Sequence, residues 1–134
     1  MKVTGNIIPD NVVRLGDKVY INIEPKDISY VDDNNNNISL FEYEQIVLPH
    51  TVNDTIIQET IRINSTEYKV RKERDSFLDY TDKKVARYRD EVELGIPPTD
   101  DLVKLTNYRQ YLRDIPNEEG FPYITIKTYE EFIL

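Results

Sequence analysis

The sequence contains no cysteine and no tryptophan, and it has only one histidine and four glycines among 134 residues. Without cysteine there is no disulfide framework, no thiol nucleophile and no thiolate metal site. The lone His50 follows Pro49 and has no second histidine to work with, so we interpret it as a loop residue rather than part of a dyad or a zinc site. No glycine lies in a phosphate-binding pattern, and no Gly-x-Ser-x-Gly motif is present. We therefore expect a protein that is not an enzyme and needs no cofactor.

Basic residues are also few, with 17 lysines and arginines against 25 acidic residues and a formal net charge of -8. Nucleic-acid binding requires clustered positive charge, so this balance argues against such a partner. No apolar run approaches the length that crosses a membrane, and the first residues lack the apolar segment of a signal peptide. We expect a soluble cytoplasmic protein with no membrane partner.

Residues 1–50 favour β-structure. Four segments there are rich in β-branched or aromatic residues, and Pro25 is expected to end the second of them. The Gly16-Asp17 pair and the Asp/Asn-rich residues 32–37 are turn signals. The segments are Val12–Leu15, Val19–Glu24, Ile28–Val31 and Ile38–Leu48. We predict a small N-terminal antiparallel sheet, in a region that could serve as a docking module.

Residues 51–134 favour helices, although the segment Asp54–Ile63 fits a helix and a strand equally well. We predict a helix from Ser65 or Thr66, a second helix that restarts at Thr81-Asp82, and an end to that helix at Gly95. The alternating segment Tyr123–Tyr129 predicts a final strand. The predicted fold class is therefore α+β: the sheet, a helical region and a C-terminal strand.

A third helix is predicted over Leu102–Ile115. Leucine and tyrosine side chains recur at spacings of three, three and four residues, which is typical of a buried helical stripe. We expect Thr99 to cap the start of this helix, and Pro116 to end it because proline disfavours helical geometry in the residue before it. The stripe consists of Leu102, Leu105, Tyr108 and Leu112.

Three motifs in this half of the chain resemble the phage tail assembly chaperones and the related tail fibre assembly proteins. The motifs are Arg71–Asp82, Tyr108–Pro116 and Gly120–Pro122, and the resemblance covers roughly residues 70–127. One departure is Lys83, which stands where the family usually has a tryptophan. The resemblance implies a protein that binds a tail fibre or other tail component and assists its folding, oligomerisation or attachment.

Such a protein would act in the host cytoplasm while the phage tail is assembled. The alternative that we keep is a structural tail or baseplate subunit that is retained in the particle. In either case the expected partner is a tail fibre or another tail or baseplate protein.

The candidate partner-binding residues lie in and behind the third helix. Tyrosine and arginine are frequent anchors of protein interfaces. A second interpretation is equally open: Tyr108 packs in the core, and the arginines pair with local carboxylates such as Asp101, Asp114 or Glu118. The candidates are Tyr108, Arg109, Tyr111, Arg113 and Phe121.

One set of residues has the spacing of calcium ligands. It comprises Asp33, Asn35, Asn37, Ser39 and Glu44. An EF-hand loop needs a glycine at its sixth position, where this sequence has Ile38, and it needs flanking helices, where strands are predicted here. We interpret the segment as a polar turn and predict no metal site.

Addition of calcium should therefore leave the melting temperature of the protein unchanged, because a ligand that does not bind the folded state cannot stabilise it. Thermal melts with calcium, with magnesium and with a chelator would check this expectation. A saturable rise of several degrees that calcium alone produces would contradict it.

Overall fold

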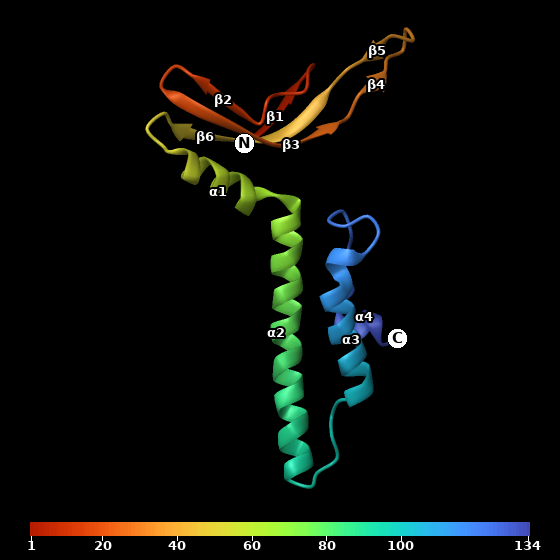
Figure 1. Cartoon of the computed structure of the whole chain (residues 1–134). Helices are drawn as coiled ribbons and strands as arrows, with labels where there is room; N and C mark the ends of the chain where they lie inside the picture. Colours follow the sequence, from red (N-terminus) through yellow and green to blue (C-terminus); the bar gives the residue numbers. More distant parts are fainter. The chain divides into compact units, whose positions relative to one another are not determined.

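The computed structural model describes all residues from Met1 to Leu134, and the chain divides into two compact units, residues 1–65 and 66–134. Each unit has its own hydrophobic core. The first contains an antiparallel sheet and the second consists mainly of helices (Figure 1), so the predicted α+β class is confirmed. The change from strands to helices falls between Pro49 and Asp54, whereas the compact units divide after Ser65.

The sheet of the first unit has four antiparallel strands in the order β1-β6-β3-β2. These are β1 (Lys2–Gly5), β2 (Val12–Leu15), β3 (Lys18–Asp27) and β6 (Phe41–Pro49). Strand β1 was not predicted. The short strands β4 (Tyr30–Val31) and β5 (Asn37–Ile38) form a separate two-stranded sheet around the Asp/Asn-rich turn. In that turn the carboxylate of Asp32 accepts hydrogen bonds from the backbone N–H groups of Asn34 and Asn36.

The core of the first unit lies on one face of β3. Because side chains alternate along a strand, Val19, Ile21 and Ile23 share this face, and all three are buried. Helix α1 (Asp54–Asn64) supplies Ile57 to the same cluster. The sheet and helix α1 therefore pack against each other as two layers, with this cluster between them.

The segment Asp54–Ile63, which fits a helix and a strand equally well by sequence, is helical in the structure as part of α1. The side chain of Asn53 caps its start by accepting a hydrogen bond from the backbone N–H of Ile56, at 2.9 Å. Such a cap satisfies one of the N–H groups that a helix leaves unpaired at its first turn. The buried Ile57 and the half-buried Ile61 lie four residues apart, which is the spacing of one helical face.

The prediction that Pro25 ends the second strand is wrong, because β3 continues to Asp27. The pairing of β3 with β6 shifts register between Ile23 and Lys26, and Glu24 has a positive φ of 43°. A bulge of this kind leaves a position in the strand that needs no ladder hydrogen bond, and proline is tolerated there.

The prediction of two successive helices before Gly95 is also wrong, because α2 runs without a break from Thr66 to Glu93. The second helix was expected to restart at Thr81-Asp82. Instead the hydroxyl of Thr81 donates to the carbonyl oxygen of Leu78, at 2.7 Å, within the same helix. This hydrogen bond to the preceding turn lets a threonine sit in a helix interior.

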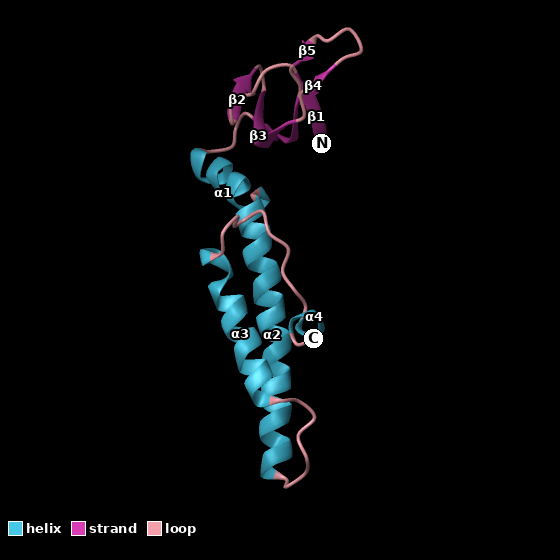
Figure 2. Cartoon of the chain, turned by 90° about the vertical axis from the view of Figure 1, so that its right-hand side faces the viewer, coloured by secondary structure: helices cyan, strands magenta, loops and turns pink.

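Helix α3 (Leu102–Asp114) lies antiparallel beside α2 (Figure 1) and continues into the 3-10 turn η1 (Ile115–Asn117). The α-helix ends at Asp114, next to the predicted end, but the predicted reason is wrong: Ile115 keeps α-helical dihedral angles, with φ -49° and ψ -44°, and Pro116 lies inside the 3-10 turn. The predicted C-terminal strand is absent: the second unit contains only helices and loops (Figure 2), and the chain ends in the short helix α4 (Tyr129–Phe132). No strand of the second unit is available to pair with this segment, so it packs against helices instead.

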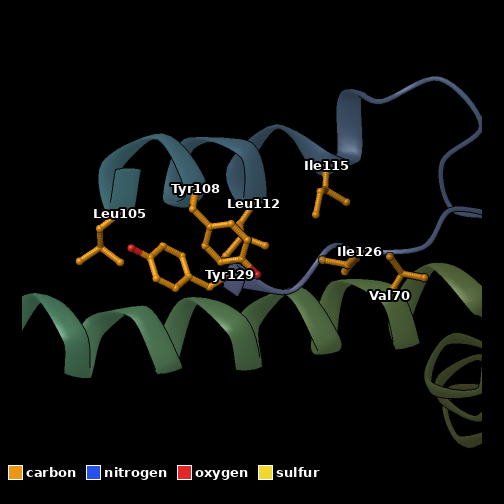
Figure 3. Close-up of a cluster of buried hydrophobic side chains, with 7 residues drawn as sticks. All are labelled: Val70, Leu105, Tyr108, Leu112, Ile115, Ile126 and Tyr129. Carbon is orange, nitrogen blue, oxygen red and sulfur yellow. The ribbon is translucent and has the colours of Figure 1, made fainter. Parts of the chain in front are cut away.

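The core of the second unit lies between α2, α3 and the C-terminal segment (Figure 3). Leu105, Tyr108 and Leu112 are buried as predicted. Leu102 is not, since 41% of it is exposed. It is the first residue of α3 and precedes the first buried turn of that helix. The buried set is Val70, Leu105, Tyr108, Leu112, Ile115, Ile126 and Tyr129.

We expect Leu105→Ala to lower the free energy of unfolding by about 2–4 kcal/mol, because the fully buried side chain would leave a cavity. The matched control Leu102→Ala should change it by less than about 1 kcal/mol, since that side chain is partly exposed and its removal leaves no enclosed cavity. Urea denaturation of both variants measures the difference. Equal effects of the two substitutions would contradict this account of the core.

Candidate functional site

Tyr108 lies at the centre of the helical unit. Its hydroxyl donates to the backbone carbonyl oxygen of Lys127 at 2.8 Å, and its ring centroid is 5.4 Å from that of Tyr129 and 5.3 Å from that of Phe132. Burial raises the pKa of Tyr108 to about 12, so the phenol stays protonated and remains a donor at neutral pH. Because the side chain is fully buried, it presents no surface to a partner in this structure.

Tyr111, one turn further along α3, binds the other backbone group of the same residue. Its hydroxyl accepts a hydrogen bond from the backbone N–H of Lys127 at 3.1 Å. Its ring stacks on Phe132, with centroids 5.1 Å apart and planes inclined by 23°. The two tyrosines of α3 therefore fix the C-terminal segment through its backbone at one residue.

Arg109 joins α3 to α2. Its Nη1 atom donates to the hydroxyl of Thr81 at 2.8 Å and forms an ion pair with Asp82. The interpretation that Arg109 pairs with a nearby carboxylate is therefore confirmed, but the partner is Asp82 and none of the three examples named. Asp101 caps α3, and Asp114 accepts a hydrogen bond from Gln110. The Thr81-Asp82 pair was visible in the sequence as part of a family motif, but its expected role was a helix start.

The remaining two candidates lie nearer the surface. Arg113 is exposed, and Phe121 is half-buried with the guanidinium carbon of Arg71 5.3 Å from its ring centroid. The five candidate residues do not gather on one surface. Tyr108 and Tyr111 hold the C-terminal segment, Arg109 holds α2, and Arg113 is the candidate with the freest access to solvent.

A polar network that was not predicted from the sequence lies at the connection between α2 and α3. The buried carboxylate of Glu91 accepts hydrogen bonds from the backbone N–H and the hydroxyl of Thr99, at 2.9 and 2.8 Å. Thr99 is thus not the cap of α3, a role that belongs to Asp101. Arg87 pairs with Asp100 at 2.6 Å.

Together, the positive groups around Asp100 affect its pKa more strongly than its burial does. Burial by itself would raise the pKa of Asp100, but the hydrogen bond from Arg87 and the nearby positive charge of Lys84 hold it below its usual range. The Lys84 ammonium lies 3.5 Å from the carboxylate. The carboxylate therefore remains charged at neutral pH and ties the connection to α2.

The same connection exposes apolar side chains. Gly95, with a φ of +72°, ends α2: its N–H donates to the carbonyl of Val92, and the N–H of Ile96 donates to that of Glu91. This is the hydrogen-bond pattern of a glycine helix terminus. Periodicity had placed Leu102 in a buried stripe, but it lies at the exposed first residue of α3. We call the exposed side chains of Val92, Leu94, Ile96, Leu102 and Val103 the turn surface.

The residues with calcium-ligand spacing are spread over the Asp/Asn-rich turn and two strands. Asn37 lies in β5, and Glu44 lies in β6, where its carboxylate is 2.6 Å from the N-terminal amino group. No group of three or more histidine, aspartate or glutamate side chains is placed to hold a metal ion. His50 lies in the turn after β6, with Nδ1 3.2 Å from the carbonyl oxygen of Asp17. None of the helices combines the length and the hydrophobicity that a membrane span requires.

Residues 67–130 match the model of the phage tail assembly chaperone protein family. The matched region lies within the helical unit and contains the motifs that carried the resemblance, which is thereby confirmed. The family supports a role in phage tail assembly and a non-enzymatic activity. The chain has no match among the curated proteins or the solved structures.

We expect Arg109→Ala to lower the free energy of unfolding by about 1–2 kcal/mol, because it removes a charged hydrogen bond to the buried Thr81 and an ion pair that is partly screened by water. Arg113→Ala should change it by less than about 0.5 kcal/mol, as is usual for an exposed side chain. Chemical denaturation of the two variants compares them directly. The reverse order of effects would show that Arg109 is not a brace.

Proposed function

We propose that this chain, whose residues 67–130 belong to the phage tail assembly chaperone family, binds a tail fibre or another tail component and assists its folding, oligomerisation or attachment. The family match is the observation that carries the proposal. The mechanism is binding without covalent chemistry, in the host cytoplasm while tails are being built. The partner would be a tail protein before it reaches its place in the particle.

The turn surface supports this mechanism. Leu94 is 74% exposed and Val103 is 68% exposed, and both lie inside the matched region. Exposed apolar side chains that lie on one short stretch of the chain are candidates for an interaction site. An unassembled tail protein exposes apolar surface that its neighbours will later bury, and the turn surface is suited to cover such a patch.

The polar network beside the turn surface supports the same proposal. The hydrogen bonds of Glu91 to Thr99 and the ion pair of Arg87 with Asp100 tie the α2–α3 connection to the end of α2. A connection held in this way presents its apolar side chains with less loss of conformational entropy on binding. The net charge of -8 would help to keep a complex with a sticky partner in solution.

The second candidate function is a structural tail or baseplate subunit that is retained in the particle. The observation that favours it is the separately folded unit of residues 1–65, which lies outside the matched region and would then be the docking module. Mass spectrometry of purified particles separates the two candidates. Stoichiometric presence of the chain would favour the structural subunit, and its absence would favour the chaperone.

We expect Ile96→Ser to reduce co-purification of the tail partner from infected or co-expressing cells, with little change in melting temperature. Ile56→Ser is the matched control. It makes the same change at a side chain of nearly equal exposure, 47% against 48%, in α1 of the first unit. An interface anchor contributes about 1 kcal/mol or more, whereas an exposed side chain contributes little to folding.

Quantification of the captured partner relative to the bait measures this effect. Equal losses for both variants would show that the turn surface has no special role. If wild-type protein captured no tail protein at all, the chaperone proposal itself would be wrong.

A further inference from the structure

A small apolar pocket lies on the helical unit, away from the turn surface. It has a volume of about 330 Å³ and is formed by neighbouring turns of α2 and by the C-terminal segment. Its walls are almost entirely apolar. The lining residues are Ser76, Phe77 and Tyr80 of α2, together with Thr128, Tyr129 and Glu130.

Glu130 is the one charged residue of this lining. It is held in place by the hydroxyl of Tyr80, which donates to Oε1 at 3.3 Å. A carboxylate on an otherwise apolar and aromatic pocket favours a ligand that is apolar along its length and positively charged at its end. A neutral apolar ligand would leave this carboxylate without a charged partner.

The aromatic rings of the pocket already accept a cation elsewhere on their surface. The ammonium of Lys84 lies 4.9 Å from the ring centroid of Tyr80 and 5.1 Å from that of Tyr129. Lys84 does not line the pocket, and its charge is balanced by Asp100 at 3.5 Å. These contacts show that the faces of both rings favour positive charge. Because Asp100 balances the charge of Lys84, the carboxylate of Glu130 can pair with a cationic ligand.

We propose that this pocket binds one arginine side chain of the tail-protein partner. The aliphatic part would lie against Phe77 and Tyr129, and the planar guanidinium would meet the carboxylate of Glu130. Arginine is favoured over lysine because its guanidinium binds a carboxylate with two donors and also stacks on aromatic rings. The assignment of the arginine to a tail protein rests on the proposed function, whereas the chemistry of the pocket does not.

The test uses the isotope-labelled full-length protein and N-acetyl-arginine amide as the probe. We expect saturable changes in the amide NMR signals of residues 76–80 and 128–130, with millimolar affinity that weakens as salt is added. N-acetyl-norleucine amide, which keeps an apolar chain without the charge, should bind at least about fivefold more weakly, the contribution of a partly screened ion pair. The affinity of N-acetyl-lysine amide should lie between those of the other two probes.

Two variants assign the charge to one residue. Glu130→Gln should weaken the binding of N-acetyl-arginine amide by about fivefold, as expected for the loss of one ion pair. Glu131→Gln is the matched control, because it removes the same charge from the neighbouring residue of α4, which does not line the pocket. It should leave the affinity within about twofold.

Each contrary result overturns the proposal. Absence of saturable signal changes would show that the pocket is not a binding site, and equal affinity for the norleucine probe would make it a purely apolar one. Tighter binding of the lysine probe would reject arginine, and equal losses in both variants would indicate unspecific attraction. These readouts need no tail protein, so their failure is distinct from a failure to capture a partner.

Discussion

The helical unit depends on the contact between Tyr108 and the C-terminal segment. Helix α2 supplies one fully buried apolar side chain to this core, Val70, while Phe77, Leu78 and Val85 pack against it partly buried. More apolar area must be buried to offset the cost of ordering the two helices. The C-terminal segment supplies the missing part as Ile126 and Tyr129, and the tyrosines of α3 hold it through the backbone of Lys127.

Polar contacts then fix how α3 lies against α2. Arg109 binds Thr81 and Asp82 near the middle of α2, and Glu91 binds Thr99 near its end. Apolar packing alone would tolerate small shifts of one helix along the other, whereas hydrogen bonds between defined atoms do not. These contacts contribute modestly to stability, because their charges lose hydration on folding, but they select one arrangement of the pair. That arrangement sets where the turn surface is presented.

The sequence predicted the parts of the fold that follow from local periodicity. The stripe Leu105, Tyr108 and Leu112 was correct because tertiary packing agreed with the helical spacing. The predictions failed where contacts elsewhere in the fold overrode a local sequence signal. Pro25 was tolerated by a bulge, Thr81 by a hydrogen bond within α2, and Leu102 lies where packing ends.

The predicted C-terminal strand shows the limit of such reasoning most clearly. The alternation that suggested it is real, since Ile124 and Ile126 turn toward the core while Thr125 and Lys127 are exposed. Alternation reports that an extended chain has one buried side, but it does not say what covers that side. Here two helices cover it, and the hydroxyls of Tyr108 and Tyr111 take the place of a neighbouring strand at Lys127.

The candidate site was harder to predict than the fold, for a reason that the structure makes plain. The motif residues that carried the family resemblance include Thr81, Asp82, Tyr108 and Arg109, and these side chains bind one another or the C-terminal segment. A motif of this kind describes the scaffold. Residues that recognise a particular partner need to face solvent. The turn surface lies between the family motifs, whereas the Glu130 pocket takes Ser76, Phe77 and Tyr80 from the motif Arg71–Asp82. We therefore infer that the buried motif residues maintain the scaffold, whereas the choice of partner depends on residues that face solvent, whether they lie inside a motif or between motifs.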